Sequence, residues 1–200
     1  MEESIYFYKI SPEKQRSILN AGFYAFARNG YQKASMNDVA REAGISKPSL
    51  FHYFGTKKDF YLFLFRFACR LVREEMQEGS EDFFDCLWLA MDIKAKLLST
   101  YPGIHAFLIT VIREQSVPLL REIQADSYQQ FEQASELLFK NVNWDKFKPE
   151  LTRKQIYHLV SYTANGVVRD HAGEPPEIIM AELKPLLLLL KPALYREEYM

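Results

Sequence analysis

The chain has little glycine, only two cysteines and no long hydrophobic run. Of its 200 residues, 8 are Gly and 2 are Cys, while 48% are hydrophobic and 14% are aromatic. The low glycine content disfavours a turn-rich β protein, and the apolar content disfavours disorder. The longest stretch without Asp, Glu, Lys or Arg, LLSTYPGIHAFLITVI, is interrupted by Pro, Gly and His and cannot span a bilayer. We therefore expect a helical protein with a sizeable core.

Cysteine usage and the opening residues indicate a reducing compartment. Cys69 and Cys86 have neither metal-ligand nor redox spacing, and both lie in helical patterns, so we expect core thiols. The opening stretch, MEESIYFYKI, is acidic and lacks the apolar segment of a secretory signal. We expect a cytoplasmic location, no membrane partner, and neither a metal nor another cofactor.

The charges are distributed unevenly along the chain. Residues 1–58 contain nine Lys and Arg against five Asp and Glu, whereas residues 59–200 contain 16 against 21. A basic N-terminal segment on an acidic body is compatible with a polyanionic partner for that segment alone. Such an imbalance also arises by chance in helical proteins, so charge alone does not identify nucleic acid as the partner.

Apolar periodicity and capping residues predict an all-α chain of about nine helices. Apolar residues recur three and four positions apart, and Ser, Thr, Pro and Gly mark the helix ends. We find no alternating strand pattern and no internal repeat. The helices are predicted at about residues 11–29, 35–43, 46–54, 56–76, 81–100, 103–115, 117–142, 152–172 and 176–199.

Residues 34–60, ASMNDVAREAGISKPSLFHYFGTKKDF, have the pattern of a helix-turn-helix. Each of the two helices is too short to be stable alone. Ala40 is small enough for the second helix to cross closely above it, and Gly44 allows the positive φ that the turn needs. The apolar residues that would fix the crossing angle are Val39, Ile45, Leu50 and Phe54. The outer face of the second helix is then free to contact a partner, although a helical corner without any ligand is the alternative.

At these residues the sequence resembles the DNA-binding segment of the TetR family of transcriptional regulators. The runs that carry the resemblance are SMNDVA (35–40), AGISK (43–47), LFHYF (50–54) and KK (57–58). It covers about residues 11–62, and the remainder matches only in length and helix arrangement. The resemblance implies a helix-turn-helix DNA-binding domain in residues 1–56 and a larger helical domain for effector binding and dimerisation in residues 57–200.

The resemblance also implies which residues contact DNA. The candidates for the major groove are Lys47, Ser49, Phe51 and His52, with Lys47 reaching guanine acceptors and Phe51 a thymine methyl. Pro48, in the first turn of the same helix, is a further DNA-binding candidate. The candidates for phosphate contacts, which set register rather than sequence, are Ser35, Asn37, Tyr53 and Lys57. Each has a structural alternative: Phe51 could close the small core, Ser35 could only cap its helix, and His52 could be a solvated surface residue.

Members of such a family are homodimers that present two recognition helices to a near-palindromic DNA operator, about one helical turn apart. The last two predicted helices would form the dimer, because the final one is too apolar to stay uncovered. Its apolar residues are Ile179, Leu183, Leu186, Leu187, Leu190 and Leu194. The alternative is that this helix packs only within its own subunit.

The resemblance further implies a small-molecule effector in the larger domain, whose binding is coupled to operator affinity. The candidate lining residues are Trp88, Phe107, Thr110, Tyr128, Phe131, Tyr162 and Asn165. Such a lining predicts a largely apolar ligand, although aromatic residues at helical spacing can equally be plain core. Arg113 or Arg169 could meet an anion, or could pair with Glu114 and Asp170.

An enzyme is the principal alternative class, and the sequence argues against it. There is no His-Glu-x-x-His, Gly-rich phosphate loop, nucleophile elbow or Cys cluster. A constitutive DNA-binding activator or architectural factor without effector control stays open, as does a purely protein-binding module. We expect a repressor, because a bound dimer can block polymerase without further machinery.

Overall fold

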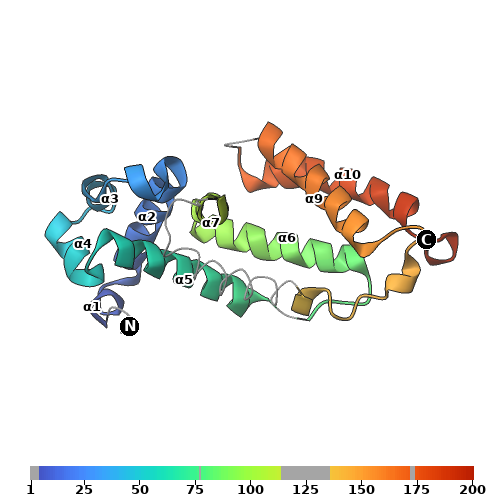
Figure 1. Cartoon of the computed structure of the whole chain (residues 1–200), viewed down its shortest axis with the longest axis horizontal. Helices are drawn as coiled ribbons and strands as arrows, with labels where there is room; N and C mark the ends of the chain where they lie inside the picture. The colour runs from blue at the N-terminus through green and yellow to red at the C-terminus, as the bar shows by residue number, and fades with distance from the viewer. Residues whose placement is uncertain (1–4, 77, 114–135, 172–173) are drawn as a thin grey trace. The chain divides into compact units, whose positions relative to one another are not determined.

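The computed structural model of the chain describes residues 5–76, 78–113, 136–171 and 174–200, and in these ranges it contains helices and no β-strand (Figure 1). The predicted all-α class is confirmed. The helices are α1 (Ile5–Tyr8), α2 (Pro12–Lys33), α3 (Met36–Glu42), α4 (Lys47–Phe54), α5 (Lys57–Glu75), α6 (Phe83–Thr100), α7 (Ile104–Arg113), α9 (Arg153–Asp170) and α10 (Pro176–Leu194), with 3₁₀ turns η1 (Trp144–Lys146) and η2 (Glu197–Tyr199).

The chain forms two compact units, and the first contains α1 to α5, most of α6, and α7. Its central helix, α2, begins where the sequence predicts, because the Ser11 hydroxyl accepts a hydrogen bond from the Lys14 amide at 3.4 Å. Gly30, with a φ of 64°, ends the regular part of α2. The predicted stop near residue 29 is confirmed as a break, because a positive φ is costly for residues that carry a Cβ, but helical residues resume after it up to Lys33.

Aromatic rings form the core of the first unit. The Phe26 ring lies 4.8 Å from that of Tyr61, and Phe107 lies 5.4 Å from Tyr61 and 5.3 Å from Phe23. These rings come from α2, α5 and α7, and all four side chains are buried. Burying each one contributes roughly 1.5–3 kcal/mol, so this cluster holds α2, α5 and α7 together as one folded body.

Helix α7 lies in close contact with α2. The Asn20 side chain donates to the Thr100 carbonyl at 3.2 Å, just before the turn that leads into α7. A Cβ atom at Gly103 would lie 3.1 Å from the Phe23 Cβ and 3.2 Å from the Tyr24 amide nitrogen. Only a glycine lets the two backbones approach this closely without one of them moving.

The second unit contains Gly79–Trp88 and the chain from Phe139 onwards, including α9 and α10. Its polar centre is the carboxylate of Asp82, which precedes α6. Lys191 and Lys146 donate to Asp82 Oδ2 at 3.2 and 3.4 Å, and the Phe84 amide donates to Oδ1 at 2.9 Å. Burial raises the pKa of Asp82, but these cations and hydrogen bonds outweigh it and hold the pKa below its ordinary value.

The last helix is shorter than predicted, because α10 ends at Leu194 and not at Tyr199. Tyr195 leaves the helix in an extended conformation and pairs with Phe147. Its buried ring packs 4.7 Å from the Phe147 ring, and its hydroxyl accepts a hydrogen bond from the Phe83 amide at 3.2 Å. Tertiary burial of this tyrosine therefore overrides the helical periodicity of the sequence.

Two further differences concern the extent of the predicted elements. The sequence does not predict helix α1, since four residues are too few to show a helical period. The predicted helix at 117–142 falls mostly outside the described residues. The other helix positions agree with the prediction to within a few residues at their ends.

Candidate nucleic-acid interface

Helices α3 and α4 form the predicted helix-turn-helix (Figure 1). Ala40 is buried beneath the crossing, and Gly44 has a φ of 67° at the turn. Leu50 and Phe54 of α4 point into the core and are buried, as is Val39 of α3. Ile45 is only half-buried but packs against the same core. With that difference, the packing that the sequence predicts for this motif is confirmed.

The opposite face of α4 is open to solvent. Lys47, Pro48 and His52 are exposed, and Ser49 is half-buried. The Ser46 hydroxyl caps the helix by accepting from the Ser49 amide at 3.1 Å, and it also pairs with the Ser49 hydroxyl at 2.7 Å. The capped N-terminus of α4 therefore presents polar and basic groups, which is the end that a recognition helix directs at base edges.

Two aromatic residues of α4 lie at the border between this open face and the core. Phe51 and Tyr53 are both half-buried and pack against the hydrophobic core of the first unit. The Lys47 ammonium lies 5.8 Å from the centroid of the Phe51 ring. Phe51 thus packs partly against the core and is partly accessible at the surface, beside the Lys47 ammonium.

The predicted phosphate-contacting residues lie at the start of α3, on α4 and at the start of α5. The Ser35 hydroxyl caps α3 by accepting from the Asp38 amide at 3.3 Å, and Asn37 is exposed in the first turn. The Lys57 ammonium lies 5.1 Å from the Tyr31 ring centroid and donates to the Gln32 carbonyl at 3.1 Å. Lys57 is therefore held at the junction of α2 and α5, and its role toward phosphate stays a prediction.

Helix α1 is a neighbour of α4 that sequence reasoning missed. The Phe7 side chain is fully buried, with its ring 5.0 Å from that of Phe54 and 5.2 Å from that of Phe63. The next residue toward the N-terminus, Tyr6, places its ring 4.7 Å from the imidazole of His52. Aromatic density in the opening IYFY was the available signal, because so many rings in a polar segment need a packing partner.

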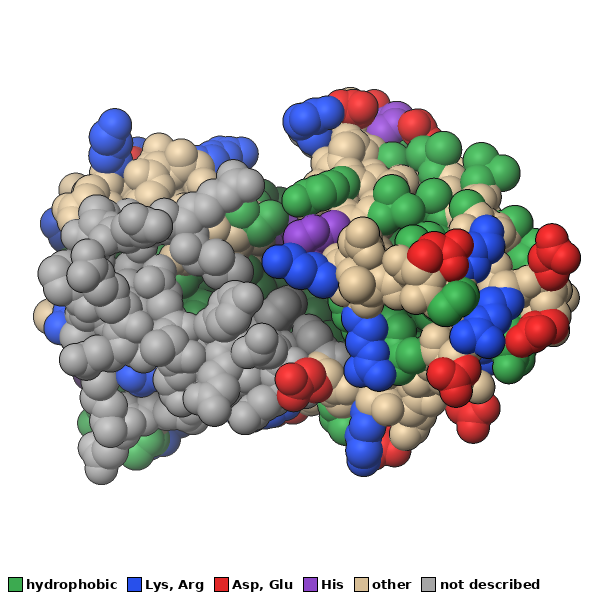
Figure 2. Space-filling view, turned by 45° about the vertical axis from the view of Figure 1, so that its right-hand side comes forward, with side chains coloured by type: hydrophobic (Ala, Val, Ile, Leu, Met, Phe, Trp, Pro, Cys, Tyr) green, Lys and Arg blue, Asp and Glu red, His purple; other side chains and the backbone are tan. Residues whose placement is uncertain are grey.

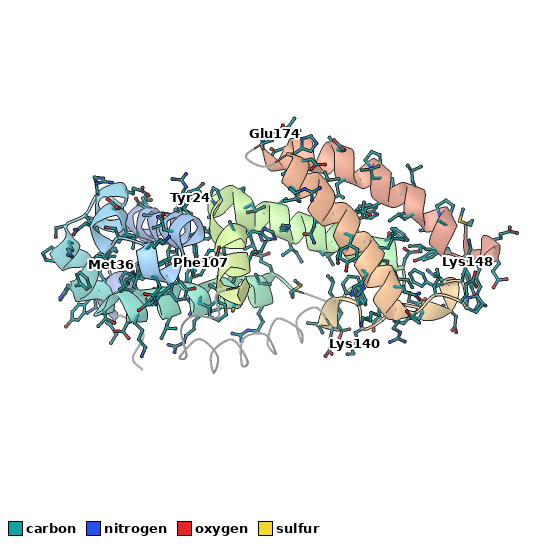
Figure 3. All side chains as sticks on the ribbon, turned by 45° about the horizontal axis from the view of Figure 1, so that its top comes forward. Tyr24, Met36, Phe107, Lys140, Lys148 and Glu174 are labelled. Atoms are coloured by element: carbon teal, nitrogen blue, oxygen red, sulfur yellow. The ribbon has the colours of Figure 1, made fainter. Side chains whose placement is uncertain are left out.

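The predicted effector residues are divided between the two units. Phe107, labelled in Figure 3, belongs to the aromatic core of the first unit, and the Thr110 hydroxyl donates to the Ala106 carbonyl at 2.9 Å. Trp88, Tyr162 and Asn165 belong to the second unit. Tyr128 and Phe131 lie outside the described residues. The role of all seven residues in ligand binding stays a prediction.

Four of the residues considered for ligand or anion binding have the following surroundings in the second unit. The Lys184 ammonium lies 5.5 Å from the Trp88 ring centroid. Tyr162 and Asn165 are exposed on α9, and the Tyr162 ring stacks 5.5 Å from that of His158. Arg169 pairs with Asp170 at 3.3 Å, as its structural alternative predicts.

The first unit also contains a partly buried pair of bases, Lys94 on α6 and His105 on α7. Burial, reinforced by the charge of Lys94, lowers the pKa of His105 to about 4, and burial lowers the pKa of Lys94 as well. His105 is thus held neutral near pH 7.

Two kinds of site are absent from the described part of the chain. Within it, no three His, Cys, Asp or Glu side chains are grouped so that they could hold a metal ion. Within the same ranges, no helix is both long enough and apolar enough to cross a membrane.

Comparison with known proteins assigns the helix-turn-helix region. A family model described as "Bacterial regulatory proteins, tetR family" matches residues 18–62. The chain is similar to the fatty acid metabolism regulator protein of Bacillus subtilis (strain 168), with 24% identity over 113 residues, 55% of this chain and 58% of that protein. It is also similar to the HTH-type transcriptional activator FasR of Mycolicibacterium smegmatis, with 32% identity over 87 residues, 36% of this chain and 40% of that protein.

A solved structure extends the likeness to the whole fold. The ketosteroid transcriptional regulator KstR2 of Mycobacterium tuberculosis superposes with a TM-score of 0.64 at 18% identity, covering 94% of this chain and 98% of that one. At this identity the likeness shows the fold alone. The chain spans about a third to three-fifths of the length of the curated relatives it matches first, at 32%, 58% and 40%.

Proposed function

Because the chain belongs to the TetR family of transcriptional regulators, we propose that it is a repressor that binds a near-palindromic DNA operator as a homodimer. The observation that carries the proposal is the open outer face of α4, where Lys47, Pro48 and His52 are exposed while Leu50 and Phe54 are buried. A helix held by its inner face and bare on its outer face can enter a major groove. Such a regulator acts where the chromosome is, so we also propose a cytoplasmic location.

Lys47 gives the direct test of this proposal. A Lys47→Ala variant should bind its operator roughly 5- to 100-fold more weakly and lose base preference at one position, because one good base contact is worth about 1–3 kcal/mol. The measurement is fluorescence anisotropy with a duplex selected by the wild-type chain from a random-sequence library. Lys96→Ala is the matched control, since it removes the same charge from an exposed pair with Glu75 on another surface.

If both variants bind as the wild type does, α4 is not the reading helix. If both weaken equally on every sequence, the protein binds DNA only through its overall charge, and the operator proposal fails.

We propose homodimerisation through α9 and α10. Large apolar side chains are exposed on both helices, and Figure 2 shows hydrophobic side chains gathered on the face where they lie. These exposed residues are Leu159, Tyr162, Ile178, Leu186, Leu188 and Leu189. An exposed apolar surface of this kind marks an interaction site, and a second copy of the same helix pair would cover it with a four-helix bundle.

The proposed effector is a small, largely apolar molecule that lowers operator affinity by binding in the larger domain. Helix α7 supports a coupling role, because it contacts α2 closely and α2 carries the helix-turn-helix. The relative named for fatty acid metabolism is compatible with an apolar effector.

Activation is the second candidate, since one relative is named an activator. A promoter–reporter assay in which deletion of the gene raises expression supports repression, and one in which deletion lowers expression supports activation.

A further inference from the structure

The N-terminal segment is fixed in place beside α4 by contacts along its length. Phe7 is fully buried among core rings. The Tyr8 hydroxyl accepts a hydrogen bond from Arg70 Nη2 of α5 at 2.9 Å, and the Gln15 side chain donates to the Ile10 carbonyl at 2.9 Å. Residues 5–10 are therefore anchored to two other helices of the same unit, and they have a definite position relative to the recognition helix.

This anchoring places a row of side chains along the surface. The Tyr6 ring lies 4.7 Å from the His52 ring, inclined at 38°, and the Lys9 ammonium lies 5.5 Å from the centroid of Tyr6. Tyr6 keeps 55% of its surface exposed although it is in contact with His52. The row Lys9, Tyr6, His52 thus continues the open face of α4 beyond the helix-turn-helix itself.

A free histidine side chain samples several rotamers, and fixing one of them on binding costs conformational entropy. A neighbouring ring that is already held by the fold restricts the imidazole before DNA arrives, so that cost is reduced. Lys9 adds a positive charge at the end of the row, where a duplex that occupies α4 would bring its phosphates.

We propose that the N-terminal segment is a second part of the DNA-reading surface, and that Tyr6 is a positioning residue for His52. The inference rests on the proposed operator binding and adds a specificity element that lies outside the helix-turn-helix. The occupant is the same operator duplex, because the surface is continuous with the outer face of α4.

The test uses the full chain and a random-sequence duplex library. The duplex that the wild type enriches is then titrated against Tyr6→Ala, Tyr6→Phe, His52→Ala and the double variant Tyr6→Ala/His52→Ala. We expect Tyr6→Ala to weaken specific binding about 2- to 10-fold, the worth of one aromatic contact. It should relax the same operator position as His52→Ala, and Tyr6→Phe should keep wild-type preference.

The double variant distinguishes positioning from an independent contact. If Tyr6 acts through His52, the double variant binds no more weakly than His52→Ala alone. Ile5→Ala is the matched control, since it removes exposed apolar surface from the same segment without touching the imidazole. Unchanged melting temperatures verify that Phe7 still anchors the segment in every variant.

Additive losses in the double variant, or wild-type preference in Tyr6→Ala, would overturn the proposal. Failure of the wild-type chain to enrich any sequence is a different result, because it would overturn operator binding itself.

Discussion

At the residue scale, two positions of this chain require glycine for different reasons, one for its backbone conformation and one for lack of space. Gly44 has a φ of 67°, and a Cβ atom added there would meet nothing within 4 Å, so only its backbone conformation demands glycine. Gly103 has no such conformation, but an added Cβ would meet the α2 backbone. The first glycine could be predicted from its motif, whereas the second depends on a contact between segments distant in the sequence.

Gly103→Ala should destabilise the protein by about 1–3 kcal/mol, because overpacking against a backbone cannot be relieved by a side-chain rotation. The free energy of unfolding from urea titration measures it. Gly166→Ala is the control, since it makes the same change within α9, where a Cβ meets nothing within 4 Å. That substitution should be neutral or stabilising by up to about 1 kcal/mol. Equal effects of the two would contradict the close approach of α7 to α2.

His105 predicts a pH dependence. The unfolded chain binds a proton at this imidazole near pH 6.5, whereas the folded protein does so only near a pKa of about 4. Between these values the unfolded state binds more protons, so the free energy of unfolding decreases as the pH falls through that window. Between pH 7 and pH 5 the loss from this group should be about 1–2 kcal/mol.

The check on this pH dependence is urea unfolding of the wild type and of His105→Gln at both pH values. The variant should lose less stability on acidification than the wild type by that amount. Parallel losses in both proteins would show that His105 titrates normally.

At the scale of elements, capping residues determine where helices begin. The Thr56 hydroxyl and the Asp59 carboxylate at the start of α5 exchange hydrogen bonds with each other's backbone amides at 3.1 Å, and Thr152 and Gln155 do the same at the start of α9. In the second pair the two distances are 2.9 and 3.3 Å. Such pairs stabilise a helix start by about 0.5–2 kcal/mol. Because both partners of such a cap lie within three residues of each other, the start of the helix can be predicted from the sequence.

Asp82 forms ion pairs with Lys191 of α10 and with Lys146. We therefore expect the charge of Asp82 to contribute more to the free energy of unfolding than the charge of the nearby Asp85. Asp82→Asn leaves Lys146 and Lys191 partly buried without a counter-charge, and we expect a loss of about 1–3 kcal/mol in unfolding free energy. Asp85→Asn removes the same charge at an exposed position and should cost less than about 1 kcal/mol. Thermal melts of both variants test this, and a larger loss for Asp85→Asn would refute the role of Asp82.

The sequence therefore predicted local features better than distant ones. The caps at Ser11, Ser35, Ser46 and Thr56, the turn at Gly44 and the inner face of α4 each depend on residues within a few positions. The end of α10 depends on Tyr195 docking against residues far away in the chain, and the four-residue α1 depends on the burial of Phe7. Helical periodicity encodes neither contact, although the aromatic density of IYFY signals that α1 needs a packing partner.

At the scale of the whole molecule, the proposed function needs a dimer. Leu189 is 71% exposed on α10, and an apolar side chain in this position is best explained by a partner that covers it. Burying one leucine contributes about 1.5–3 kcal/mol, and each such residue counts twice in a symmetric interface.

Leu189→Glu should therefore convert the dimer to a monomer at micromolar concentration, as measured by sedimentation velocity. It should also weaken operator binding, because a monomer reads only one half-site. Ser99→Glu, which adds the same charge at an exposed position of α6, should leave both properties unchanged. A Leu189→Glu protein that sediments as the wild type does would place the dimer elsewhere or exclude it.

The close approach at Gly103 has a mechanical consequence. At Gly103 no side chain separates the chain from the α2 backbone, so we expect a displacement at the start of α7 to shift α2 as well. An effector that displaces the start of α7 would therefore also displace α2, which packs against the helix-turn-helix. A methyl group added at Gly103 would change both the spacing of the two backbones and the size of that displacement.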